Sequence, residues 1–531
     1  MSDDQGRATA KPSHRVSDDP WNCIRVFRRL EVGPVRIERQ RVVTAYTLHT
    51  DEGTSTIDLI YRYEQDVFDL TDPAAHNLGA MITAQLALNY GLFAEVIRFN
   101  GFYDETDRQF LRDMAENTAR EITVKKFLEH NPFLRGAAAE LPAVKRDRYC
   151  RAKLEFVDTL GSAKGSTVAK RWSVGDDCRK HAILSSGGKE SLLTLGLLRE
   201  IGTDAHPIFI NESGRHWLTA VNGHRHLAVN HPGTERVWTN SDRLFSWFLR
   251  HMPFVRQDFA NVRSDEYPIR LWTVAVFLFG ALPLLRRDGI GRISVGDEFD
   301  TSRRARLSGI HHYGGLYDQS VYFDRMLTRY YSKKGWGVQQ FSLLRNLSEL
   351  LVQKTLAERY PDLQQHQMSC HAAHVDGSRV RPCGKCEKCR RVVAMLLAFD
   401  SDPRQCGYST QQIDDCLRAL ATESIHQESE GAQHLAYLLK EKGLLEAGSG
   451  GLPDPRSRPE IQKLRFDNQR APWSLLPADL RPAVYGILLE HADGAVVRDG
   501  RDWRDFDPLS HEESNQQIGR EPLWTPFTWV N

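Results

Sequence analysis

A short strand that passes through two glycines into a helix restricts the fold of this chain more than any other part of its sequence. The apolar run His181–Ser185 predicts a buried strand, and the spacing of apolar residues from Glu190 to Glu200 predicts an amphipathic helix. Gly187 and Gly188 lie between the two. We therefore expect a βα unit that begins at His181.

The same alternation continues toward the carboxyl end of the chain. Further strands are predicted at residues 207–211, 236–239 and 292–296, and helices at residues 241–251 and 270–286. Strands that alternate with helices form a mostly parallel sheet with helices on both faces. The sequence therefore predicts an α/β domain with a doubly wound, mostly parallel sheet over residues 176–400.

The two ends of the chain follow other patterns. Residues 21–175 start with short β-rich pieces and continue with helical spacing, which predicts an N-terminal α+β accessory region. Residues 401–531 carry helical patterns, and we expect a helical C-terminal extension there. Residues 1–20 are polar and mixed in charge, which predicts a disordered tail.

Charge and hydropathy restrict the partners of the protein. The 531 residues include 70 Lys and Arg against 69 Asp and Glu, so the formal net charge is +1 and nucleic-acid binding is not indicated. The polar start and the absence of an apolar run of membrane-spanning length predict a cytoplasmic protein with no membrane partner.

The cysteines are unevenly distributed. Four of the nine lie between residues 370 and 389 and form a Cys-x12-Cys-x2-Cys-x2-Cys array. Four thiolates at such spacing are typical of a closed, structural, tetrahedral zinc site, and an iron–sulfur cluster is the alternative. The predicted ligands of this zinc knuckle are Cys370, Cys383, Cys386 and Cys389.

The glycine segment is suited to hold a phosphate. Gly187 and Gly188 let the backbone approach an anion, Ser186 and Ser191 add hydroxyl donors, and the helix N-terminus adds the positive end of its dipole. Lys189 adds a charge. The segment lacks the Walker A spacing, which argues against kinase-like transfer. The alternative is a turn between strand and helix that binds nothing.

Residues 185–191, Ser-Ser-Gly-Gly-Lys-Glu-Ser, resemble the Ser-Gly-Gly-X-Asp-Ser loop of the PP-loop ATP pyrophosphatases, with Glu190 in place of Asp. Followed by the cysteine array, the loop resembles that of the QueC-like proteins, the relatives of 7-cyano-7-deazaguanine synthase. The resemblance covers residues 180–399. The long flanks are similar to those of the extended QueC-like proteins of bacterial antiphage systems.

This resemblance implies a PP-loop (HUP-like) fold and an enzyme that uses ATP and Mg²⁺. A carboxylate, that of 7-carboxy-7-deazaguanine, would be adenylated and then attacked by ammonia or by an amine of a partner protein. Ser186, Lys189 and Glu190 would be catalytic. The ATP-binding residues would be Ser185, Ser186, Gly187, Gly188, Lys189, Glu190, Ser191 and Asn211, the last because it ends the second strand.

Two further segments resemble the substrate side of this family. Gly296 and Asp297 lie at a strand end, as the family's glycine loop does, and Tyr317 and Asp318 resemble part of its Tyr-Pro-Asp-Cys-Arg segment. A carboxylate accepts hydrogens from a guanine-like edge, and a tyrosine stacks on the ring. The alternative for each acid is a set of turn hydrogen bonds.

Two other functions remain open. A tRNA-modifying PP-loop enzyme would need a basic surface, for which Arg303, Arg304 and Arg306 offer a small patch. A catalytically degenerate scaffold would be consistent with Glu190. In either case the long flanks suggest a protein partner.

Overall fold

The computed structural model describes residues 19–158, 179–212, 214, 216–262, 267–445 and 450–511. The predicted disordered tail lies almost wholly outside these ranges. The predicted boundary between residues 175 and 176 also lies outside them.

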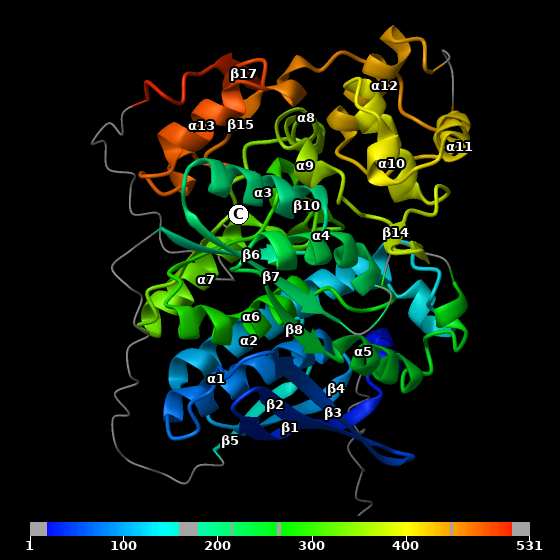
Figure 1. Cartoon of the computed structure of the whole chain (residues 1–531). Coiled ribbons are helices and arrows are strands. Elements are labelled where there is room, and N and C mark those ends of the chain that lie inside the picture. Colours follow the sequence, from blue (N-terminus) through cyan, green and yellow to red (C-terminus); the bar gives the residue numbers. More distant parts are fainter. Residues whose placement is uncertain are drawn as a thin grey trace, which may run out of the picture.

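A ten-stranded sheet runs through the molecule in the order β12-β9-β6-β7-β8-β3-β2-β1-β4-β5 (Figure 1). Its first five strands are all parallel. They are β6 (Lys180–Ser185), β7 (Asp204–Asn211), β8 (Glu235–Thr239), β9 (Arg292–Ser294) and β12 (Gln339–Phe341). The strands predicted at residues 181, 207, 236 and 292 are confirmed within a few residues.

The N-terminal region supplies the other half of the same sheet. Its strands are β1 (Phe27–Glu38), β2 (Arg41–Thr50), β3 (Gly53–Tyr63), β4 (Ala94–Gly101) and β5 (Lys153–Asp158). The first three form an antiparallel meander, whereas β4 and β5 run parallel to β1. β3 pairs antiparallel with β8 and so joins the two halves. The prediction of a mixed α/β fold with a mostly parallel sheet is confirmed.

Helices cover both faces of the parallel half (Figure 1). On one face α3 (Lys189–Glu200) contacts β6 and β7, and α4 (Trp217–Asn230) contacts β7. On the other lies α6 (Val274–Asp288). Neighbouring residues of β6 therefore enter different cores, Ala182 with α6 and Ile183 with α3. Because both faces of β6 are buried, its sequence is a continuous apolar run and does not alternate between apolar and polar residues.

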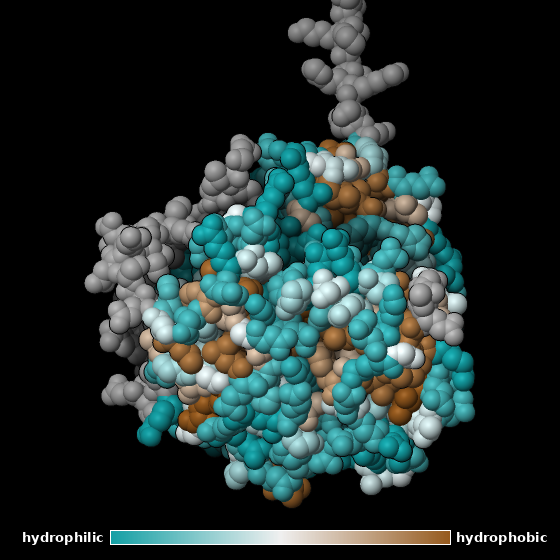
Figure 2. Space-filling model, turned by 90° about the horizontal axis from the view of Figure 1, so that it is seen from above, coloured by the Kyte–Doolittle hydropathy of each residue, from teal (hydrophilic) through white to brown (hydrophobic). Residues whose placement is uncertain are grey.

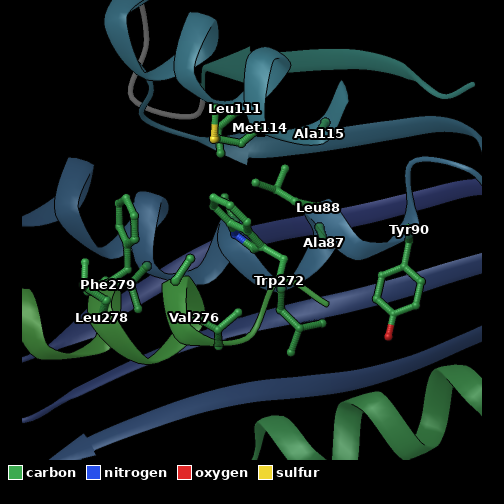
Figure 3. Close-up of a cluster of buried hydrophobic side chains, with 14 of the residues drawn as sticks. Ala87, Leu88, Tyr90, Leu111, Met114, Ala115, Trp272, Val276, Leu278 and Phe279 are labelled. Atoms are coloured by element: carbon green, nitrogen blue, oxygen red, sulfur yellow. The ribbon is translucent and has the colours of Figure 1, made fainter. Parts of the chain in front are cut away.

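The N-terminal helices share a core with α6. Figure 3 shows side chains from the 3₁₀ helix η2 (Gln85–Tyr90), α2 (Glu105–Ile122) and α6 gathered around Trp272. The Trp272 indole donates to Gln85 Oε1 at 3.2 Å, and its carbonyl accepts from Asn89 Nδ2 at 3.0 Å. One core therefore serves both regions.

The C-terminal extension contains helices and strands. The predicted helices are present as α11 (Thr410–Leu420) and α12 (Ser429–Glu441). The predicted helical extension is only partly helical, because β15 (Leu464–Phe466), β16 (Ala495–Asp499) and β17 (Asp502–Asp505) form a small sheet beside α13 (Arg481–Leu489). Strands this short carry no alternating pattern, and contacts with the core of α3 and α8 (Glu349–Arg359) position them.

Two further elements had no clear sequence signal. They are the hairpin of β10 (Arg304–Leu307) and β11 (Ile310–Tyr313), and the helix α7 (Val321–Lys333). Of the helices in the described ranges, none combines the length and the apolar character needed to span a membrane.

Candidate functional site

The glycine loop, residues 186–188, lies where the strand order of the parallel half reverses. From β6 the chain proceeds outward to β7 and β8 and then returns to β9 on the other side of β6. In open α/β sheets, ligands bind beyond the carboxyl ends of the strands at this reversal. The loop follows β6 directly, and Gly296 to Glu298 follow β9. Both segments therefore lie at the carboxyl edge of the parallel half.

Close backbone contacts fix the loop. Gly187 has φ 77°, and a Cβ there would lie 2.4 Å from the carbonyl oxygen of Thr219 in α4. A Cβ on Gly296 would lie 2.6 Å from Cβ of Glu190. Glycine is needed at both positions, because a side chain would push α4 or the segment after β9 away from the start of α3. The start of α3 is thus held from two sides.

The carbonyl groups of the loop are all occupied. Gly187 O accepts from the amide of Met368 at 3.0 Å, Ser186 O from Thr219 Oγ1 at 3.4 Å, and Gly188 O from Ser191 Oγ at 3.1 Å. Each of the three loop carbonyl oxygens therefore accepts a hydrogen bond from a donor within the protein.

The amides at the start of α3 are left for another acceptor. Gly188 is the N-cap of the helix, and no side chain caps it in the described structure. Nearby, Ser186 Oγ accepts from the Gly188 amide at 3.4 Å, and Ser185 Oγ donates to Ser191 Oγ at 3.3 Å. Uncapped first-turn amides carry partial positive charge, so this helix start can bind an anion.

Lys189 does not present a free charge to such an anion. Its side chain is only 6% exposed, and Nζ pairs with Glu190, with Glu349 Oε1 at 2.9 Å and with Glu298 Oε1 at 3.6 Å. Burial opposes the charge, but the three carboxylates outweigh it and raise the pKa of Lys189 above its ordinary value. Lys189 therefore serves here to neutralise and order carboxylates.

The carboxylates around Lys189 outnumber their cations. Arg391 Nε is the second cation and lies 3.5 Å from Glu349 Oε1. Burial, followed by the charge of Glu190, raises the pKa of Glu298 well above its ordinary value. Among the described residues, these acids do not form a preformed three-ligand cage. Mg²⁺ is commonly bound by one or two carboxylates together with phosphates, so Glu190 and Glu298 suit a metal that arrives with a nucleotide.

A second group of polar side chains lies beyond β7. Asn211 ends the strand and is half-buried. Glu212 Oε1 accepts from Arg270 at 2.8 Å and from Ser241 Oγ at 3.0 Å. The Arg270 guanidinium lies 3.7 Å from the centre of the Tyr267 ring. Glu212 directly follows a strand, and this position indicates a candidate ligand contact. No sequence signal marked Arg270 or Tyr267.

His216 adds an uncharged ring to this group. It stacks on Tyr267 with ring centres 5.3 Å apart and lies 4.6 Å from the ring of His371. Burial, assisted by Arg270 and Lys388, lowers the pKa of His216 to about 3, so the ring is neutral at pH 7. Flat rings next to a buried ion pair are suited to contact a planar base.

The predicted substrate acids make internal bonds. Arg345 is fully buried, and its NH2 lies 3.3 Å from Asp297 Oδ2 and 2.7 Å from Asp324 Oδ2. Asp318 Oδ2 accepts the amides of Thr273 and Val274 at 2.8 and 2.7 Å and so caps α6. Both acids therefore bond to groups from distant parts of the chain, and not to turn amides as in the alternative interpretation.

Tyr317 and Asp318 are both buried. Both line a cavity of about 10 Å³, which has room for one water molecule. Only Gly296 and Asp297 of the four predicted substrate residues lie beside the loop. Substrate binding by Tyr317 and Asp318 stays a prediction.

The four clustered cysteines converge on one point. The sulfur pairs Cys383–Cys389, Cys370–Cys386 and Cys386–Cys389 lie 3.9, 3.7 and 3.5 Å apart. Four thiolates at about 2.3 Å around one tetrahedral zinc ion would lie roughly 3.8 Å apart. The distances therefore fit a single metal ion and are far longer than a disulfide bond. The ligands of an iron–sulfur cluster bind more than one iron and would lie further apart.

Bonds on both sides of the cysteine cluster reach the glycine loop. Met368, two residues before Cys370, donates its amide to Gly187 O. Arg391, two residues after Cys389, pairs with Glu349, which holds Lys189. Cys389 and Arg391 lie on the same helix, α10 (Glu387–Ala398). A metal in the cluster would therefore also fix groups that support the loop.

Comparison with the models of known protein families gives no match for this chain, and comparison with curated proteins gives none either. The geometry of the site therefore carries the functional argument.

Proposed function

We propose that this protein is an ATP-dependent enzyme that adenylates a carboxylate, with release of pyrophosphate, and then transfers the acyl group to an amine. The observation that carries the proposal is the uncapped start of α3 at the reversal of the strand order, with every loop carbonyl turned to protein donors. Such a helix start favours the pyrophosphate of a nucleotide.

Each part of the site has a role in this proposal. The first-turn amides and Ser186 Oγ bind the pyrophosphate, and Glu190 and Glu298 would hold Mg²⁺, which neutralises phosphate charge. The rings of His216 and Tyr267, near Asn211, are suited to the adenine. The acid would bind beside the loop, beyond the carboxyl ends of β6 and β9. Lys189 keeps Glu190 and Glu298 in position.

The chemistry consists of two substitutions. A carboxylate oxygen attacks the α-phosphorus of ATP, and pyrophosphate leaves with its bonding electrons. The amine then attacks the acyl carbon, loses a proton, and AMP leaves. Holding the mixed anhydride beside the nucleophile accelerates the second step. The resemblance to QueC-like proteins supports 7-carboxy-7-deazaguanine as the acid and ammonia or a protein amine as the acceptor.

AMP release from ATP, Mg²⁺ and an ammonium salt tests the proposal, with and without 7-carboxy-7-deazaguanine. We expect AMP only with the acid, and a loss of about a hundredfold in the Ser186→Ala variant, as for removal of one positioned donor. Ser378→Ala is the control, because Ser378 is exposed between β13 (His374–Asp376) and β14 (Arg379–Arg381). Equal activity in both variants would remove the loop from the mechanism.

A scaffold with an inactive loop is the second candidate. The observation that favours it is the pairing of Lys189 with carboxylates, which places negative charge close to the anion site. Calorimetry separates the two functions, because a scaffold of this kind would not bind ATP with Mg²⁺. Saturable ATP binding that Ser186→Ala weakens supports the enzyme.

A further inference from the structure

A polar hollow of about 380 Å³ lies between the central domain and the small C-terminal sheet. Its walls come from the 3₁₀ helix η6 (Phe299–Ser302), the start of α12, the 3₁₀ helix η9 (Pro459–Gln462) and the β15–β17 region. The volume falls within the range of small-molecule sites. None of the residues assigned above to ATP or substrate lines it.

Arginines dominate the lining of this hollow. Six arginines face four carboxylates, and five of the six have no carboxylate partner in the described structure. These five are Arg303, Arg458, Arg470, Arg498 and Arg501. The sixth, Arg465, is 3% exposed and makes a bidentate ion pair with Glu428, in which NH1 and NH2 donate to Oε1 and Oε2 at 3.0 and 2.8 Å. Among the described residues, its Nε has no hydrogen-bond partner.

Two aromatic rings hold several guanidinium groups in position. The rings of Phe299 and Trp503 lie 5.9 Å apart. Arg465 and Arg470 lie over Phe299 at 4.1 and 5.5 Å from its centre, and Arg498 lies over Trp503 at 5.0 Å. Stacked guanidinium groups keep their N–H donors at the edge, and less side-chain entropy is lost when an anion binds.

We propose that this hollow is a second anion site, separate from the glycine loop, which binds a ligand with several phosphate charges. Arginine forks without a carboxylate partner match the oxygens of phosphate groups two at a time, and several forks around one cavity favour a ligand with more than one charge. The part-exposed Trp503 ring would also accept a planar base. Polyphosphate and a nucleotide share this chemistry.

The face of the molecule that carries the C-terminal elements is consistent with this proposal. Figure 2 shows the molecule from the side where β17 and α12 lie in Figure 1. Hydrophilic residues cover most of this view, and hydrophobic residues form separate patches. A polar ligand therefore meets a largely hydrophilic surface.

Calorimetric titration of the full chain with inorganic tripolyphosphate tests the second site. We expect the Arg470→Gln/Arg501→Gln double variant to bind at least about tenfold more weakly, because it removes two sets of charge-assisted donors to phosphate oxygens. The matched control is Arg404→Gln/Arg418→Gln, because these side chains are 65% and 67% exposed and lie outside the hollow. The control should bind as the unaltered chain does.

Further variants and a second ligand complete the test. The binding that the double variant loses should persist in Ser186→Ala, and Glu430→Gln, which removes an exposed acid from the lining, should strengthen it. Competition by AMP would identify a nucleotide site, and failure of AMP to compete would identify a polyphosphate site. Equal binding by the double variant and its control, or loss of binding only in Ser186→Ala, would overturn the proposal.

Discussion

The contact between Gly187 and α4 allows a sharp test of the loop geometry, by Gly187→Ala. Alanine at φ 77° costs about 1–2 kcal/mol, because its Cβ approaches the carbonyl oxygen. In addition the new methyl would lie 2.4 Å from Thr219 O, and such overpacking costs roughly 1–3 kcal/mol. The free energy of unfolding should therefore fall by about 2–5 kcal/mol.

Gly202 provides a matched control at the other end of α3. It has φ 76°, and a Cβ there would meet nothing within 4 Å. Gly202→Ala therefore carries the backbone cost without the contact, about 1–2 kcal/mol. The difference between the two variants isolates the contact between the loop and α4.

Urea unfolding followed by circular dichroism measures both variants, and calorimetry with ATP and Mg²⁺ measures the loop itself. We expect Gly202→Ala to bind ATP normally and Gly187→Ala to lose most of its affinity, because the start of α3 must move away from α4. Equal unfolding midpoints for the two variants would refute the steric argument. Normal ATP binding by Gly187→Ala would show that the loop tolerates this movement.

Three further predictions concern buried acids, the cysteine cluster and a buried arginine. Burial raises the pKa of Asp318 to about 6 from 3.8, so its stabilising contribution is present below pH 4 and lost as the pH rises through 6. The unaltered chain should lose about 3 kcal/mol more than Asp318→Asn between pH 4 and 7 in matched urea titrations. Elemental analysis should find one zinc per chain, and Cys23→Ser, the control variant, should bind zinc equally well. Removal of the zinc by a chelator should weaken ATP binding. An ATP affinity that does not change on zinc removal would contradict this. Arg345→Met should destabilise the fold by about 3–5 kcal/mol, because Asp297 and Asp324 stay buried without their cation. A melting temperature like that of the unaltered chain would contradict this.

Local patterns were enough to predict the centre of the fold. The strand at His181, the glycine turn and the helix that follows have period, length and turn residues that all indicate the same βα unit, and the structure has β6 and α3 there. The cysteine spacing likewise predicted four sulfurs that the fold brings together. In both cases the interacting residues are close in sequence or carry unusual chemistry.

Other features depend on contacts between distant segments. β15 pairs with β16, although their paired residues Leu464 and Ala495 are far apart in sequence, and short strands do not reveal such pairing. The role of Lys189 depends on Glu298 and Glu349, which come from other parts of the chain. The capping of α6 by Asp318 was not predicted either, because a motif fragment does not show that α6 starts beside it. The sequence thus indicated candidate residues but not the residues that surround them.

The pairing of β3 with β8 affects how the protein resists self-association. Tyr61 and Tyr63 pair with Thr239 and Val237, and the Asn240 side chain extends the ladder through Ile60 N and Asp58 O. Without the N-terminal region, β8 would become an open edge with unpaired backbone groups, which recruits strands from other chains. The meander therefore protects the edge of the parallel half of the sheet. A shortened chain that starts at residue 179 would aggregate even if every residue of the candidate site were intact.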